Sequence, residues 1–152
     1  MAAPDVKSRD AEPPPWVPWR WWRRWFGQRS ERAAAQFLRR RGYRILAANV
    51  ADRRGELDLL ALDGDTLVVV EVRSTSSTHP DALTLTAASV DIRKQKRITE
   101  TTTRFLAQRG LLGRIAVRYD VLAIVWPPAA RQPTIRHILN AFESTGRFQF
   151  FT

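Results

Sequence analysis

The stretch that decides the fold is GELDLLALDGDTLVVVEVR, which covers residues 55–73. It contains two apolar runs, Glu56 to Asp63 and Thr66 to Ser74, and these are separated by Gly64 and Asp65. A two-residue turn that contains glycine, flanked by apolar runs, is typical of a β-hairpin. The stretch therefore predicts two antiparallel strands, and the turn sets which of their residues face each other.

This register places two acidic side chains opposite each other at the end of the hairpin away from the turn. Asp58 faces Glu71, and Glu56 faces Arg73. Opposed carboxylates on neighbouring strands repel, and in strands this apolar neither is well hydrated. Such a pair must neutralise itself, find cationic partners or hold a metal. A divalent cation with oxygen ligands, Mg²⁺ or Mn²⁺, resolves the repulsion. The alternative is a Glu56–Arg73 salt bridge, with Asp58 and Glu71 at the solvated end of the sheet.

The rest of the chain predicts helices and further strands around this hairpin. The segment 74–89 is rich in Ser, Thr and Ala and is expected to be a loop. The resulting order is αβββαββ, which is typical of a mixed α/β domain. The other expected elements are a helix from its N-cap Ser30 to Gly42, strands over 43–48, 118–126 and 134–138, a helix over 91–108 with Ile92, Ile98, Phe105 and Leu106 inward, and a final turn over 139–142.

Composition narrows the class of protein. The chain has 152 residues, 25 Lys and Arg against 15 Asp and Glu, a net charge of +10 and no cysteine. The length suits one domain, and the lack of cysteine excludes a disulfide scaffold and thiolate chemistry. No apolar run is long enough to span a membrane, and we expect a cytoplasmic protein. The Arg-dominated surplus favours a polyanionic partner, nucleic acid or an anionic membrane, and the alternative is charge spread over a solvated surface.

Residues 1–27 differ in composition from the rest and are expected to form a disordered leader. Five of the six tryptophans lie between Trp16 and Phe26, interleaved with arginines. Such a segment can lie at a membrane surface, or it can pair phosphate contacts with base stacking. The third alternative is that the aromatic side chains dock on the domain's own surface, because exposed tryptophan is unfavourable.

Further motifs accompany the hairpin in a fixed order: ERAAAQFL (31–38), GYRIL (42–46), Asn49, DIRKQKRI (91–98) and HILNAF (137–142). Together with GELDLL (55–60) and VEVR (70–73), this ordered set resembles the YraN-like family of bacterial proteins. That family is regarded as related to the archaeal Holliday-junction resolvases and to the PD-(D/E)XK nucleases. The resemblance implies a restriction-endonuclease-like fold, in which helices flank a mixed central sheet. It spans residues 28–143 as a nuclease-like domain and leaves 144–152 as a tail.

The resemblance implies a metal-dependent endonuclease that hydrolyses phosphodiester bonds in DNA, which could be branched or repair-associated. In that pattern Asp58 and Glu71 bind Mg²⁺ or Mn²⁺ with help from the carbonyl of Val72. Glu31, on the first helix, reaches the same metal or its water. The metal lowers the pKa of the attacking water and stabilises charge on the phosphoryl oxygens.

The resemblance also implies that the helix beginning at Asp91 faces the substrate phosphates. Cationic side chains surround several faces of this helix, which would make DNA binding strongly dependent on salt. The alternative is a solvated helix. The residues expected to bind nucleic acid are Arg93, Lys94, Gln95, Lys96 and Arg97.

One position departs from the nuclease motif, which has lysine where this chain has Arg73. Arginine keeps the positive charge, but it is planar and effectively never deprotonated, so it could clamp a phosphate oxygen but not act as a base. Lys94 is a candidate for supplying the missing ammonium group. The departure leaves open a nucleic-acid-binding protein of nuclease fold with little or no catalysis. A peripheral membrane protein that binds through the leader is the third alternative, and a homodimer is one alternative for assembly.

Overall fold

The computed structural model describes residues 29–129 and 131–144. The expectations for the leader, including Trp16–Phe26, and for residues 145–152 lie outside the described residues. The structure has a mixed α/β fold, as the sequence predicted. Its elements are α2 (Arg29–Arg40), β1 (Arg44–Ala51), β2 (Glu56–Asp63), β3 (Thr66–Ser76), α3 (Ala82–Ala88), α4 (Ile92–Gln108), β4 (Val117–Trp126) and β5 (Thr134–Phe142).

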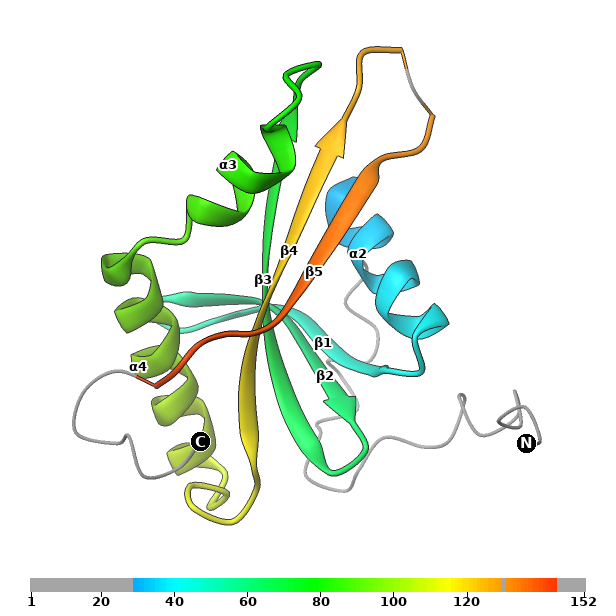
Figure 1. Cartoon of the computed structure of the whole chain (residues 1–152). Coiled ribbons are helices and arrows are strands. Elements are labelled where there is room, and N and C mark those ends of the chain that lie inside the picture. The colour runs from blue at the N-terminus through cyan, green and yellow to red at the C-terminus, as the bar shows by residue number, and fades with distance from the viewer. Residues whose placement is uncertain (1–28, 130, 145–152) are drawn as a thin grey trace.

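The five strands form one sheet in the order β1-β2-β3-β4-β5 (Figure 1). Strands β3 and β4 are parallel, and every other neighbouring pair is antiparallel. A parallel pair needs a crossover connection, and the chain makes it through α3 and α4. Within the described residues, no helix is long and apolar enough to cross a membrane.

Helices cover both faces of the sheet, with α2 and α4 on opposite sides (Figure 1). Alternate residues of the hairpin point into these two cores, because successive strand side chains point to opposite faces. The core beneath α2 contains Ala34, Ala35, Leu38, Leu59, Ala61, Val68 and Val70, and the core beneath α4 contains Leu60, Leu67, Val69, Ile98, Phe105 and Leu106.

The hairpin prediction is confirmed from the turn as far as the pair Leu59–Val70. Gly64 adopts a positive φ of 58°, which a tight hairpin turn requires and glycine adopts freely. Asp63 faces Thr66, as the two-residue turn predicted. The strand-to-strand ladder ends at Leu59–Val70, and this end of the hairpin carries the candidate site.

Two elements differ from their sequence-based expectations. The segment 74–89 is not all loop, because β3 continues to Ser76 and helix α3 follows with Ala82 and Thr86 buried. The prediction of a final turn over 139–142 is wrong, because strand β5 continues to Phe142. A bulge in β5, where Leu139, Asn140 and Ala141 stand opposite Asp120 alone, allows Tyr119 to pair with Phe142, and their rings stack with centroids 5.1 Å apart. In both places tertiary packing overrides a weak local signal.

Two side chains also differ from expectation. Ser30 is not an N-cap: it lies within α2, where it is buried and its Oγ accepts a hydrogen bond of 2.9 Å from Nε1 of Trp126. Ile92 is not inward: it is the first residue of α4 and is 73% exposed. The other three residues expected to face inward from α4 are buried.

Gly55 lies just before β2, where the chain passes close to α4. A Cβ atom at this position would overlap Oγ1 of Thr101. That hydroxyl is held in place, because it donates to the carbonyl of Arg97 (2.8 Å) and accepts from Nη2 of Arg104 (3.1 Å). We therefore expect Gly55→Ala to lower the free energy of unfolding by about 1–3 kcal/mol, the usual effect of overpacking, in urea denaturation.

A double-mutant cycle checks this cause. Thr101→Ala removes the hydroxyl that the new methyl group would meet, so Gly55→Ala should lose much less stability in that background. Equal losses in both backgrounds would show that the two residues do not collide.

Candidate metal centre and nucleic-acid interface

The candidate site forms where β2 and β3 stop pairing. The backbone N–H of Val72 donates to Oδ2 of Asp58 over 2.9 Å, so a side chain takes the place of a backbone ladder bond. This bond orients the half-buried Asp58 carboxylate at the open end of the hairpin. Asp58 and Glu71 lie close enough for the charge of Asp58 to raise the pKa of Glu71. The structure thus brings together the two acids that the register predicted.

Glu71 is the buried member of this pair, with 3% of its side chain exposed. Burial first, and the charge of Asp58 second, raise the pKa of Glu71 to about 7. Lys94 opposes both effects, because its Nζ lies 3.2 Å from Oε1 of Glu71. A carboxylate placed in this way is unfavourable for folding, and perturbed acids of this kind concentrate at functional sites.

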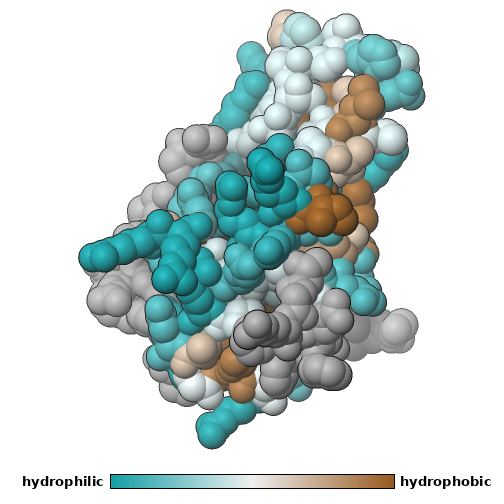
Figure 2. Space-filling model, turned by 90° about the vertical axis from the view of Figure 1, so that its left-hand side faces the viewer, coloured by the Kyte–Doolittle hydropathy of each residue, from teal (hydrophilic) through white to brown (hydrophobic). Residues whose placement is uncertain are grey.

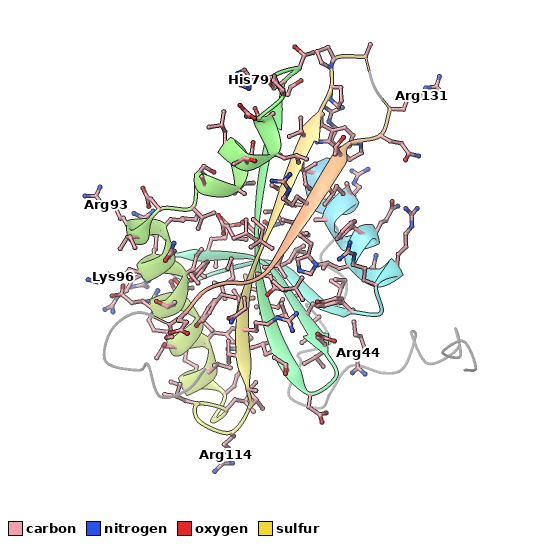
Figure 3. The ribbon with its side chains drawn as sticks, in the orientation of Figure 1. Arg44, His79, Arg93, Lys96, Arg114 and Arg131 are labelled. Carbon is pink, nitrogen blue, oxygen red and sulfur yellow. The ribbon has the colours of Figure 1, made fainter. Side chains whose placement is uncertain are left out.

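Lys94 lies in the first turn of helix α4, which places its side chain beside Glu71. The N-cap Asp91 accepts a hydrogen bond of 2.8 Å from the backbone N–H of Lys94, which anchors the first turn of the helix. Gln95 donates from Nε2 to the carbonyl of Val90 over 3.1 Å. The remaining cations predicted to bind nucleic acid are exposed, and Figure 3 shows two of them projecting away from the sheet. These exposed residues are Arg93, Lys96 and Arg97.

Arg73 lies beside the acid pair, where the motif has lysine. Its Nε donates to Oγ of Ser89 over 2.8 Å, and its Nη1 lies 3.8 Å from Oε1 of Glu71. These partners replace the Glu56–Arg73 bridge that the sequence left as an alternative. The guanidinium group is therefore held at the rim of the site by the segment between α3 and α4.

Glu31 accepts a hydrogen bond of 3.1 Å from Nδ2 of Asn49, which joins α2 to β1. Across residues 29–129 and 131–144, no three His, Cys, Asp or Glu side chains gather closely enough to hold a metal ion. The role of Glu31 as a third ligand therefore stays a prediction. Asp58, Glu71 and the carbonyl of Val72 are oxygen donors of the kind that suits Mg²⁺, which is commonly bound by one or two carboxylates with water and substrate phosphates. The donor set fits such an ion.

A second buried polar cluster lies on β4 and β5 and was missed by the sequence analysis. Asp120 is fully buried and accepts hydrogen bonds from Nε (2.9 Å) and Nη2 (3.0 Å) of Arg118 and from the backbone N–H of Asn140 (2.9 Å). Nε2 of His137 lies 2.7 Å away. Burial raises the pKa of Asp120, but these bonds outweigh it and hold the pKa below its ordinary value.

This cluster is separate from the candidate site. His137 packs edge-on against Phe37 and Tyr43, which belong to the α2 side of the sheet, whereas Glu71 meets Lys94 from α4. One signal in the sequence could have revealed it: Asp120 interrupts the otherwise apolar run from Tyr119 to Trp126. An acid in a buried strand needs hydrogen-bond partners, and Arg118 stands two residues away on the same face.

Comparison with known proteins identifies the family. The model of the uncharacterised protein family UPF0102 matches residues 30–124, which is more than half of the chain. The chain belongs to the UPF0102 family. UPF0102 is the YraN-like family, so the resemblance seen in the motifs is confirmed.

Individual UPF0102 proteins match most of the chain. The protein of Rhodopirellula baltica is 42% identical over 128 residues, which cover 82% of this chain and 74% of the relative. The protein of Ectopseudomonas mendocina is 43% identical over 119 residues, covering 78% and 94%, and that of Persephonella marina is 38% identical over 120 residues, covering 77% and 92%. The family description names no activity.

Glu71 should make the stability of this UPF0102 protein depend on pH. Its pKa of about 7 in the fold lies above the ordinary 4.5, so the folded state binds more protons than the unfolded state between these values. Stability therefore falls as the pH rises through that interval. In EDTA, we expect the free energy of unfolding to fall by about 2–3 kcal/mol from about pH 5 to about pH 8 on account of this group.

The measurement is the difference in free energy of unfolding between the wild type and Glu71→Gln across that pH range. The amide does not titrate, so this variant should lack the fall. Glu56→Gln, at an exposed acid on the neighbouring strand, is the matched control and should keep it. A difference between wild type and Glu71→Gln that stays constant with pH would contradict the prediction.

Proposed function

We propose that this UPF0102 protein is a metal-dependent endonuclease that hydrolyses phosphodiester bonds in DNA. The observation that carries the proposal is the buried Glu71, which lies beside Asp58 and within 3.2 Å of Nζ of Lys94. A metal-bound phosphate would meet two carboxylates and an ammonium group in one place. The net charge of +10 suits a polyanionic substrate. The acid pair with Lys94 and the positive net charge both fit DNA as the substrate. We propose that the protein meets it in the cytoplasm.

Different residues would bind the metal ion and contact the phosphate. Asp58, Glu71 and the carbonyl of Val72 would hold Mg²⁺ or Mn²⁺, with Glu31 as the further ligand that the family pattern implies. When bound, such an ion lowers the pKa of water and stabilises charge on phosphoryl oxygens. Lys94 would donate from Nζ to a phosphoryl oxygen, in the role that the motif gives to lysine.

Arg73 would act on the same phosphate in a different way. Its guanidinium group is planar and permanently charged, so it can clamp a phosphate oxygen but cannot take a proton from water. The exposed Arg93, Lys96 and Arg97 on α4 would contact the DNA backbone further from the site, together with Gln95. Because such contacts release counterions, DNA affinity should fall steeply with salt.

The test is cleavage of labelled linear duplex, single-stranded and four-way-junction DNA, with Mg²⁺ or Mn²⁺ against EDTA. We expect metal-dependent cuts that fall at least about 100-fold in Asp58→Asn, since this change removes a charged ligand of the ion that would stabilise transition-state charge. Asp65→Asn is the matched control, because Asp65 is exposed at the opposite end of the same hairpin. Equal cleavage by Asp58→Asn and the wild type would reject the site.

The second candidate function is DNA binding with little or no catalysis, and Arg73 in the lysine position favours it. Cuts made by Arg73→Lys but not by the wild type would mean that one residue disables an otherwise intact site. If no variant cuts while salt-dependent DNA binding persists, the binding function is supported instead.

A further inference from the structure

A pocket of about 590 Å³ opens between the end of β3 and α3, next to the acid pair. Arg73 lines it at the end near Glu71, and His79 lines it further along the chain. Five of its lining side chains carry hydroxyl groups, and none is acidic. A cationic, hydroxyl-rich hollow without carboxylates suits a ligand that carries negative charge and hydrogen-bonding edges.

His79 is oriented for such a ligand. Its Nδ1 accepts a hydrogen bond of 3.1 Å from the backbone N–H of Asp81, so the neutral ring carries its proton on Nε2. The residue is exposed, and Figure 3 places it at the end of the molecule beyond α3. Its flat ring is also a surface on which a base can stack.

The wall of the pocket on α3 carries one apolar side chain, Leu85, that is open to solvent. Leu85 lines the pocket and is 61% exposed, and Ala82 and Val72 continue the apolar surface. Figure 2, which views this side of the molecule, shows hydrophobic residues standing beside a hydrophilic surface. An apolar wall facing hydroxyl groups matches a nucleobase, which has apolar faces and polar edges.

We propose that this pocket binds an unpaired nucleotide of the DNA strand, next to the phosphate that the Asp58–Glu71 site would hold. The proposal rests on the proposed function and names its substrate class: DNA that carries an unpaired nucleotide, as in a bulge, flap or gap. A paired base cannot enter the pocket while it is stacked in a duplex. Extruding it requires breaking pairing and stacking, whereas an unpaired nucleotide has no pairing to break and only its stacking to lose.

The orientation of the nucleotide follows from the charges. Arg73 lies beside Glu71, so it would meet the phosphate on the side of the metal site, and Nε2 of His79 would meet a more distant phosphate or base edge. Hydroxyl groups both donate and accept hydrogen bonds, so they can satisfy the edge of any base. The pocket therefore selects an unpaired state rather than a sequence.

The experiment measures DNA binding in EDTA, so that the readout does not depend on catalysis. The probe is a labelled duplex with one unpaired 2-aminopurine, compared with the fully paired duplex of the same length. We expect the wild type to bind the bulged DNA about tenfold more tightly, as stacking of a single base allows. The 2-aminopurine fluorescence should rise on binding, because the base leaves the stack.

Leu85→Glu places a carboxylate on the pocket wall at an exposed position, and it should reduce the preference to less than about twofold. Leu139→Glu makes the same change at another exposed leucine, on β5 and outside the pocket lining, and should keep the full preference. The ratio of the two Kd values is compared, so the added negative charge cancels. His79→Ala is a second exposed variant and should also reduce the ratio.

Equal Kd values of the wild type for the two DNAs would overturn the proposal that the pocket binds an unpaired nucleotide. An unchanged ratio of the two Kd values in Leu85→Glu would overturn it as well. The proposed activity fails separately. Cleavage without a preference for unpaired nucleotides would support the endonuclease and overturn the pocket. A preference without cleavage would support the pocket and overturn the endonuclease.

Discussion

Replacing Lys94 by methionine should slow DNA cleavage by about 10²–10³-fold while leaving the fold intact. Methionine keeps the length and the apolar stem of the side chain and removes only the ammonium group. That group lies 3.2 Å from Oε1 of Glu71, so it is the cation placed to support charge on a phosphate held there. Burial and the charge of Asp58 both raise the pKa of Glu71, and Lys94 opposes them. Loss of the ammonium group therefore favours the protonated form of the Glu71 carboxyl. Single-turnover cleavage with Mg²⁺ in excess measures the effect on the rate.

Lys96→Met is the matched control on the same helix. Lys96 is 66% exposed and pairs loosely with Glu100, with Nζ and Oε1 3.9 Å apart. Its removal should weaken DNA binding slightly and leave the single-turnover rate at saturating protein within about threefold of the wild type. Wild-type rates in both variants would show that Lys94 takes no part in catalysis. Thermal unfolding of each variant separates a lost fold from a lost function.

Asp120→Ala should lower the free energy of unfolding by about 3–5 kcal/mol, as expected when one partner of a buried ion pair is removed. The carboxylate is fully buried and bonds to the guanidinium group of Arg118 and to the backbone of Asn140, with His137 2.7 Å away. Without it, the guanidinium group of Arg118 on β4 and the backbone N–H of Asn140 on β5 lose their acceptor. Denaturation in urea at neutral pH gives the difference directly.

Asp63→Ala provides the comparison, because Asp63 also bonds to Arg118, over 2.9 Å, but is 47% exposed. A pair that solvent screens in this way contributes little, so we expect a loss below about 1 kcal/mol. Similar losses in the two variants would contradict the view that burial makes the Asp120 cluster important.

The hairpin could be read from the sequence because its signals are local. Gly64 and Asp65 mark the turn, and a two-residue turn sets the register as far as Leu59–Val70. Counting one residue further along each strand brought Asp58 near Glu71, which the electrostatic effect of one on the other bears out. The pairing of Lys94 with Glu71 was harder to foresee, because it depends on how α4 crosses the sheet. The family motif suggested a lysine near the site, and the structure supplies the contact.

The sequence did not predict helix α3, the end of strand β5 or the Asp120 cluster, and one physical cause is common to all three. Each depends on contacts between residues that are far apart in the chain. Helix α3 has few helix signals of its own, and it forms against β3 and β4. Strand β5 extends to Phe142 because a bulge in β5, opposite Asp120, realigns the pairing. His137 has as its partner Asp120, which lies 17 residues earlier in the chain and on a different strand. None of these contacts leaves a periodic pattern in a single sequence.

The parallel pairing of β3 with β4 also bears on the order in which the chain folds. Leu67 pairs with Val117, 50 residues later, whereas β1, β2 and β3 are joined by short connections. Contacts between distant segments form slowly, because closing a long loop loses conformational entropy. The β1–β3 meander is therefore expected to be an early folding unit, with β4 docking after the crossover helices. The two carboxylates would meet early during folding, and Lys94 would reach them only in the last stage.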